Sequence, residues 1–264
     1  MGTIRRALQK VLPGRLTKSA NGTGTVPAPA PAPGVDYEGA WNSYARQWRD
    51  RFPSLTHVGD EWTGRQSGAA ATVTEYMQLI EDRFITPYVE PSDTVLEIGV
   101  GGGRTAVLLR AHSEQLICAD IASDMLDATR ARLGEDGVRY VKIDGVRLDG
   151  IPAHGVDVCF CFDTLVHIEP RDIFNYLTRI PPLMRGKRLV VLHHSNVLSE
   201  RGWQRFLSEW DKGLMGRRHG RSFSVMTDSI MQRFLDHLGY EVLLKDTDSI
   251  PRDCVWVVRA PLTG

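Results

Sequence analysis

An acidic residue and three alternating glycines form the segment with the clearest chemical potential. Glu97 lies in the apolar run 94–98, and Gly99, Gly101 and Gly103 follow that run. Glycines allow the backbone to turn sharply and allow a ligand to lie against the main chain. A buried strand that enters such a turn and then a helix is typical of a nucleoside-cofactor site at the carboxyl end of a parallel strand. We therefore expect these four residues to bind a cofactor of that class.

The glycines alone also permit a dinucleotide-binding interpretation. Gly101, Gly103 and Ala106 fit the pattern G-x-G-x-x-A. The register that begins at Gly99 fails, because Arg104 takes the third glycine position. An NAD(P)-dependent oxidoreductase would be expected to carry a Tyr-x-x-x-Lys or a similar proton donor, and the chain has no Tyr-x-x-x-Lys. Dinucleotide binding therefore stays the alternative for this loop.

Alternating strands and helices are expected to position the loop. The strand candidates are apolar on both faces, as buried parallel strands require, and cover 94–98, 116–120, 138–143, 156–162, 188–193, 240–245 and 253–259. The helix candidates cover 74–88, 104–111, 123–133, 170–184 and 227–238. The last two strands are too close in sequence for a crossover helix, so we expect an antiparallel hairpin. The pattern predicts an α/β fold with a Rossmann-like open sheet of about seven strands, mostly parallel with a C-terminal antiparallel hairpin, and helices on both faces.

Composition divides the chain into three parts. Residues 1–35 are basic and rich in Pro and Ala, contain no carboxylate, and are expected to be a disordered tail. Residues 36–90 are expected to form an N-terminal helical cap, in which the irregular, aromatic-rich stretch 41–71 packs across the mouth of the sheet or in the core. Residues 91–264 form the cofactor-binding domain. Its insertion near 195–224 carries Trp, Phe and Arg residues suited to a lid or an acceptor site, or is a solvated surface helix.

The overall charge is balanced. Lys plus Arg and Asp plus Glu each total 32, so nothing argues for a nucleic-acid partner, and a small molecule is the expected one. The four cysteines lie in apolar runs and are expected to be reduced, buried thiols. No apolar stretch is long enough to cross a membrane, and the N-terminus lacks the apolar core of a secretory signal. We expect a cytoplasmic protein, with a homodimer as one candidate assembly.

Four segments in order make the chain resemble class I S-adenosylmethionine (SAM)-dependent methyltransferases from about residue 70 onward. They are LEIGVGGG at 96–103, LICADIASDML at 116–126, VKIDG at 141–145 and DVCFCFDTLVHI at 157–168. The resemblance implies SAM as the cofactor, with Glu97 orienting its amino-acid part. It also places the end of the fourth strand at the sulfonium.

The resemblance gives a role to the carboxylate that ends the second strand. Asp120 is expected to accept both ribose hydroxyls, which a side chain with one oxygen cannot do, and Ile121 is expected to line the site beside it. The alternative is that Asp120 caps the helix that begins near Ser123. Asp144 and Gly145 are expected to receive the adenine amino group, and the alternative for Asp144 is a turn residue.

Two polar clusters at later strand ends are the catalytic candidates. His167 is expected to be the general base, because imidazole titrates near neutrality. Asp163 is expected to contact the cofactor or to hold His167, and the alternative for His167 is a helix-terminal hydrogen bond. His193 and His194 end the fifth strand, where alternation lets one of them reach the same cavity. Of these two, His194 is our catalytic candidate.

A divalent metal is a further hypothesis for these residues. Quinone-precursor and small-RNA 2′-O-methyltransferases carry an E-x-x-E-H metal motif at this strand end, where this chain has Asp163, Val166 and His167. The second carboxylate is missing, so that metal site is not fully preserved. Asp163, His167 and His194 would hold Mg²⁺ with waters and substrate completing the shell, or the histidines act as bases or packing residues.

The acceptor is the least determined part of the expected reaction. The chain resembles actinobacterial sugar O-methyltransferases of the methylmannose polysaccharide type in its compact domain and in the histidine after the fourth strand. This resemblance implies methyl transfer to a hydroxyl of a small molecule or saccharide. A phenol- or quinone-type acceptor is the second interpretation, and a SAM-binding module without catalysis is the third.

Overall fold

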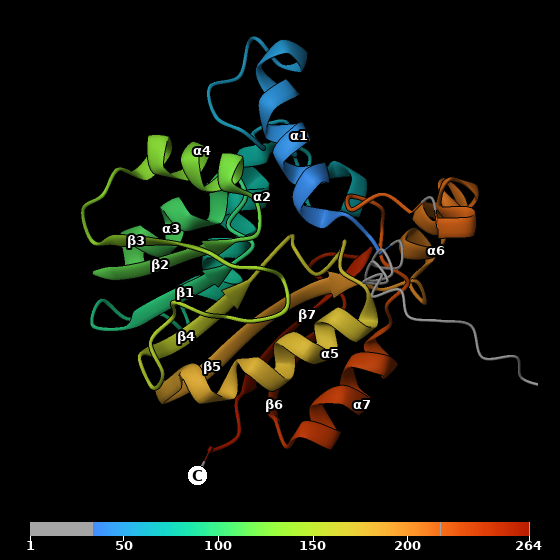
Figure 1. Ribbon diagram of the computed structural model, residues 1–264. Coiled ribbons are helices and arrows are strands. Elements are labelled where there is room, and N and C mark those ends of the chain that lie inside the picture. The colour runs from blue at the N-terminus through green and yellow to red at the C-terminus, as the bar shows by residue number, and fades with distance from the viewer. Residues whose placement is uncertain (1–33, 217, 264) are drawn as a thin grey trace, which may run out of the picture. The chain divides into compact units, whose positions relative to one another are not determined.

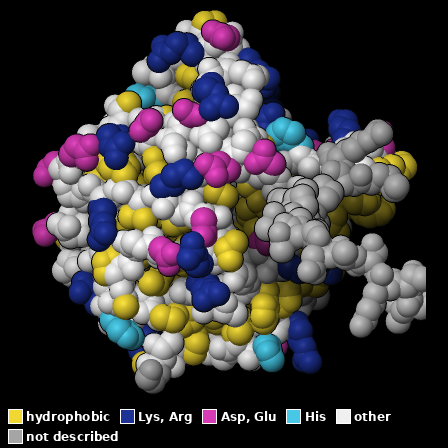
Figure 2. Space-filling view, viewed as in Figure 1, with side chains coloured by type: hydrophobic (Ala, Val, Ile, Leu, Met, Phe, Trp, Pro, Cys, Tyr) yellow, Lys and Arg dark blue, Asp and Glu magenta, His cyan; other side chains and the backbone are white. Residues whose placement is uncertain are grey.

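The computed structural model describes residues 34–216 and 218–263. The expected disordered tail lies almost entirely outside these ranges. Within them, no helix is long and apolar enough to cross a membrane. Figure 2 shows basic and acidic side chains interspersed over one face of the molecule.

Seven strands form one sheet, as the sequence predicts (Figure 1). They are β1 (Thr94–Ile98), β2 (Gln115–Asp120), β3 (Val138–Lys142), β4 (Val156–Cys161), β5 (Met184–Ser195), β6 (Glu241–Asp246) and β7 (Asp253–Arg259). Their order is β3-β2-β1-β4-β5-β7-β6, and the pairs among β1 to β5 are parallel. Strand β7 runs antiparallel to both β5 and β6. The sheet is therefore mostly parallel with one reversed strand.

Helices cover both faces of the sheet (Figure 1). One face packs against α2 (Val73–Ile80), α3 (Arg104–His112) and α4 (Ser123–Leu133). The other packs against α5 (Pro170–Arg179) and α7 (Asp228–Leu238). The sheet thus has two buried apolar surfaces, which explains why its strands are apolar at successive positions. All four cysteines are free and buried, as expected.

Two expected helices are shorter than the sequence pattern suggests. The pattern over 74–88 becomes α2 followed by a π-helical turn at Glu81–Ile85. The pattern over 170–184 becomes α5 followed by a 3₁₀ turn at Pro181–Leu183. Two successive prolines, Pro181 and Pro182, end that helix because each removes a backbone donor.

A helix forms at the start of the stretch that we expected to be irregular. Helix α1 covers Tyr37–Arg51, and the side chain of its N-cap Asp36 accepts a hydrogen bond from the Gly39 N–H at 2.7 Å. Residues 52–71 contain turns and the 3₁₀ turn Arg65–Ser67. The prediction was wrong for 41–51 because α1 buries only two residues, Ala40 and Trp48, so it has no apolar stripe of helical period.

Candidate active site

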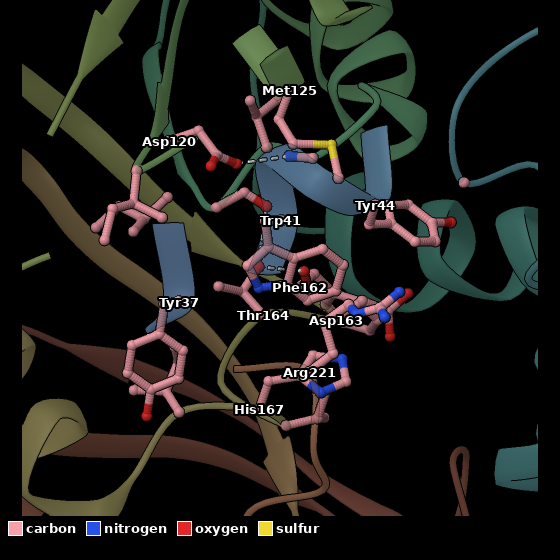
Figure 3. A pocket seen from close by; sticks show the side chains of 18 of the residues that line it. Tyr37, Trp41, Tyr44, Asp120, Met125, Phe162, Asp163, Thr164, His167 and Arg221 are labelled. Atoms are coloured by element: carbon pink, nitrogen blue, oxygen red, sulfur yellow. Dashed lines mark hydrogen bonds between the residues drawn. The ribbon is translucent and has the colours of Figure 1, made fainter. Parts of the chain in front are cut away.

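A cavity of about 630 Å³ opens at the carboxyl ends of β1, β2 and β4 (Figure 3). This volume lies within the range of small-molecule sites. Its lining comes from the loop after β1, from the segments after β2, β3 and β4, from α1 and the segment 58–66, and from Arg205, Arg221, Phe223 and Arg252. Figure 3 shows Asp120 and Met125 at one end of the cavity and His167 and Arg221 at the other.

The three glycines of the loop have positive φ angles but different surroundings. A Cβ atom at Gly99 (φ 75°) would lie 2.2 Å from Thr164 Cγ2, so this glycine permits close packing of the loop against the segment after β4. A Cβ atom at Gly101 (φ 56°) would meet nothing within 4 Å. Gly101 therefore presents bare backbone with open space beside it. Gly103 is the N-cap of α3 and faces Thr129 rather than the cavity.

Asp120 holds the loop and lines the cavity. Its carboxylate accepts hydrogen bonds from the Gly101 N–H at 2.9 Å and the Ala122 N–H at 2.8 Å. Burial raises the pKa of Asp120 to about 6, and these backbone donors oppose the increase. Ile121 lies beside Asp120 on the cavity wall. Helix α4 begins at Ser123 with Ala122 as its N-cap, so Asp120 supports the approach to that helix as well as the glycine loop.

Asp144 and Gly145 also line the cavity, but the Asp144 side chain is engaged in its own turn. It accepts hydrogen bonds from the Val146 and Arg147 backbone N–H groups and from the Arg147 guanidinium. The Arg147 N–H is the main reason that the pKa of Asp144 falls to about 2. The turn role is thus formed in the structure, and adenine recognition stays a prediction.

Glu97 supplies a buried polar atom that lacks a partner. Its side chain is 2% exposed, and no described residue forms a hydrogen bond with Oε2. Burial, reinforced by the negative charge of Asp120, raises the pKa of Glu97 well above its usual range. A buried carboxyl oxygen without a partner is costly, so a ligand donor at this point would stabilise it.

Asp163 is the centre of a hydrogen-bonded network at the end of β4. Its carboxylate accepts hydrogen bonds from the Tyr76 hydroxyl at 2.8 Å and from Arg104 Nη2 at 2.9 Å. It also lies 3.3 Å from His193 Nδ1. Although burial opposes ionisation, these partners hold the pKa of Asp163 well below its usual range. Its φ of 54° is unusual for a residue with a side chain, and the network stabilises this conformation.

His193, rather than His194, faces this network. The His193 ring stacks on Phe162 with ring centroids 4.4 Å apart, and Nε2 lies 3.2 Å from Asp253 Oδ2. Burial alone would lower the pKa of His193, but the carboxylates of Asp163 and Asp253 raise it above the usual value. His193 therefore connects the cavity to the buried pair of Asp253 and Arg252.

His194 points to the opposite face of the sheet. Its Nε2 accepts a hydrogen bond from Trp256 Nε1 at 2.9 Å, and its Nδ1 lies 2.7 Å from the Ser195 carbonyl oxygen. Both nitrogens are thus engaged, burial lowers the pKa to about 4, and the residue is absent from the cavity wall. The structure does not place His194 where a catalytic or metal-binding role would require it.

The predicted metal site is not supported. Asp163 is engaged by Tyr76, Arg104 and His193, and His194 lies on the other face. Across 34–216 and 218–263, no group of three or more His, Cys, Asp or Glu side chains could hold a metal ion. The donor set Asp163, His167 and His194 therefore does not fit Mg²⁺, because its members do not converge.

His167 is in a suitable electronic state for a base. The Ser222 carbonyl oxygen can only accept, so its 3.3 Å contact with Nδ1 assigns the ring proton to that nitrogen. Nε2 then carries the lone pair, and no other described side chain or backbone group forms a hydrogen bond with the ring. Burial lowers the pKa of His167 to about 4, so the ring is neutral at pH 7. Trp41 of α1 packs edge-on against it at 5.2 Å.

Aromatic and basic side chains form the cavity end around His167. Trp41 contacts Tyr44 at a centroid distance of 5.6 Å, and the guanidinium of Arg221 lies 5.3 Å from the centre of the Tyr44 ring. Phe223 lines the same cavity. The sequence pointed to the aromatic residues of 41–71 and to the Arg-rich insertion near 195–224 as a lid or acceptor site, and Arg221 of that insertion lines the cavity.

Comparisons with known proteins point to methyltransferases. A family described as a methyltransferase domain matches residues 95–185. Methyltransferase nsrG of Aspergillus novofumigatus (strain IBT 16806) is 32% identical over 81 residues, which cover 30% of this chain and 31% of that protein. The chain thus matches less than a third of the length of this curated relative.

Solved structures share the fold at low sequence identity. Magnesium protoporphyrin IX methyltransferase (ChlM) from Synechocystis PCC 6803 with bound SAH has a TM-score of 0.60 and 15% identity, and the alignment covers 84% of this chain and 98% of that one. An S-adenosylmethionine-dependent methyltransferase from Mesorhizobium loti has a TM-score of 0.53 and 15% identity, with coverage of 70% and 97%. The chain therefore shares the fold of these methyltransferases, and residues 95–185 match a methyltransferase-domain family.

Proposed function

We propose that the protein is a SAM-dependent methyltransferase that transfers a methyl group to a hydroxyl of a small molecule. The observation that carries this proposal is the pairing of an unpartnered carboxyl oxygen at Glu97 with open backbone at Gly101, both on the wall of one cavity. The first needs a hydrogen-bond donor, and the second leaves room for a ligand against the main chain. An amino-acid group joined to a nucleoside supplies both.

The proposed cofactor roles follow from the cavity wall. Glu97 accepts a hydrogen bond from the ammonium group of SAM. Asp120 accepts hydrogen bonds from the ribose hydroxyls on its remaining lone pairs, and Ile121 packs beside the nucleoside. Asp144 and Gly145 lie at the adenine end. When bound, SAM supplies a methyl carbon activated by a positively charged sulfur. Asp163, fixed by Tyr76 and Arg104, provides negative charge at the end of β4, where the resemblance places that sulfur.

His167 is the proposed general base. Its Nε2 lone pair takes the proton of the acceptor hydroxyl as the new oxygen–carbon bond forms and the carbon–sulfur bond breaks. The lowered pKa keeps Nε2 free at every pH above about 5. It also makes the imidazole a weak base, so the acceptor proton must be fairly acidic.

The low basicity of His167 affects how readily saccharide and phenol acceptors would lose their hydroxyl proton. The sugar ring of a saccharide, the expectation from the methylmannose-type resemblance, can stack on Trp41 or Tyr44. A phenolic hydroxyl fits the same rings, and its pKa of about 10 makes its proton far easier to remove than that of an alcohol. The phenol-type acceptor is thus the second candidate, and the pKa of His167 favours it.

Replacing His167 tests the catalytic part of the proposal. Methyl transfer from labelled SAM to a panel of phenols and sugars should fall about 100-fold or more in His167→Gln, because a positioned base contributes about that factor. His237→Gln, an exposed histidine on α7, is the control and should retain full activity. Unchanged turnover in His167→Gln would disprove the base assignment. SAH binding without turnover on any acceptor would favour a SAM-binding module.

A further inference from the structure

Buried polar atoms without partners concentrate around the cavity. Four such side-chain atoms occur among the described residues, and they belong to Trp62, Glu97, Arg221 and Ser224. Three of these residues, all but Ser224, line the cavity. Glu97 is accounted for by the proposed cofactor. Arg221 lies at the other end, beside His167, and lacks an equivalent partner (Figure 3).

Arg221 differs from the other arginines of the cavity wall in its lack of a carboxylate. Arg104 pairs with Asp163, Arg205 with Glu209 and Arg252 with Asp253. No described group accepts a hydrogen bond from the Arg221 guanidinium or forms an ion pair with it. Residues 1–33, 217 and 264 include no Asp or Glu, so the undescribed residues add no acidic side chain.

The charges that face Arg221 do not neutralise it. Burial and the positive charge of Arg51 lower the pKa of Arg221, and Arg51 itself bonds only to Gln47 among the described side chains. Glu61 is the nearby carboxylate on the cavity wall, but it accepts hydrogen bonds from the Tyr44 hydroxyl and the Trp48 indole. Among the described side chains, Arg221 thus lacks a carboxylate that would neutralise it.

The chain places Arg221 at a defined position relative to the base. The next residue, Ser222, holds His167 Nδ1 through its carbonyl oxygen. Arg221 lies over Tyr44, Tyr44 contacts Trp41, and Trp41 contacts His167. Arg221 and His167 therefore lie at the same end of the cavity and are linked through the rings of Tyr44 and Trp41, which meet edge to face. An acceptor bound at that end can reach both side chains.

We propose that the methyl acceptor carries an anionic group, a carboxylate or a phosphate, which Arg221 binds while the acceptor hydroxyl lies at His167. This inference rests on the proposed function for its account of the hydroxyl. A guanidinium matches both anions with two parallel hydrogen bonds, and the free nitrogens of Arg221 supply the donors. The unpartnered Nε of Arg221 is one of these donors.

Calorimetry with matched anionic and neutral probes tests the inference. Benzoate is compared with benzamide, and phenyl phosphate with phenol, on protein saturated with SAH and on protein without it. At least one anion should bind about tenfold or more tightly than its neutral counterpart. A tenfold difference in Kd corresponds to about 1.4 kcal/mol of binding free energy. The stronger of the two pairs identifies carboxylate or phosphate as the recognised group.

Two variants make the result specific. Arg221→Gln should reduce the preference for the anion to within about twofold, whereas Arg221→Lys should retain part of it because only the paired hydrogen bonds are lost. Arg233→Gln removes the same charge from the exposed side of α7 and should change nothing. The inference is overturned by the absence of saturable anion binding at millimolar concentration, or by a preference that survives Arg221→Gln. Failure of the wild type to bind SAH would instead count against the proposed function.

Discussion

Replacing Gly101 with alanine should separate cofactor binding from folding. The φ of Gly101 is 56°, and a Cβ atom there meets nothing within 4 Å. Gly239, the C-cap of α7, has φ 75° and only the Pro261 Cβ atom at 3.9 Å. Gly101→Ala and Gly239→Ala therefore both force alanine into a left-handed backbone conformation, and neither creates a clash. The conformational strain should lower the free energy of unfolding by about 1–2 kcal/mol in each variant. For a domain of this size, that lowers Tm by roughly 2–8 °C.

Only the Gly101→Ala methyl group enters the cavity. If the cofactor lies against the Gly101 backbone, the methyl displaces it, and SAH affinity should fall about tenfold or more, a loss of at least about 1.4 kcal/mol. Gly239→Ala should bind SAH as the wild type does. Thermal denaturation and calorimetry of the two variants give both quantities. Equal SAH affinity in the two variants would refute the placement of the cofactor on this loop.

Two further substitutions test the carboxylates. Because the pKa of Asp120 is about 6, its carboxylate becomes protonated on acidification and loses acceptors, so SAH affinity should fall about tenfold from pH 7 to pH 5. Asp120→Asn should bind weakly at both pH values, and a titration that retains the wild-type slope would contradict the assignment. Asp253→Asn should cost about 3–5 kcal/mol of stability, because it leaves Arg252 buried without its carboxylate and removes one of the two carboxylates beside His193. Denaturant unfolding measures this loss, and a change below about 1 kcal/mol would mean that the network matters little.

The strands and the glycine loop could be predicted because burial on both faces leaves a strong sequence signature. Six of the seven strands begin and end within about two residues of the expected positions. Strand β5 starts earlier, at Met184, and ends later, at Ser195. The loop at Gly99 to Gly103 could be recognised because glycine adopts positive φ angles without strain, and at Gly99 it also leaves room for Thr164.

The same two-sided burial concealed which histidine of β5 contacts Asp163 at the cavity. Val190, Val191 and Leu192 are all apolar, so β5 shows no alternation that assigns His193 or His194 to a face. The register of β5 against β4 and β7 decides the matter, and that register is a tertiary property. The sequence pointed to the arginines of the insertion 195–224, but it could not show that Arg218 pairs with Glu169 while Arg221 lacks a carboxylate, because such pairing depends on the tertiary structure.

SAH binding measured by calorimetry tests the central claim most directly. The proposal predicts one SAH molecule bound per chain, with affinity lost in Gly101→Ala and retained in Gly239→Ala. Binding of NADH without binding of SAH would contradict the proposal. It would instead support the dinucleotide-binding interpretation of the glycine loop, in which Ala106 takes the third glycine position.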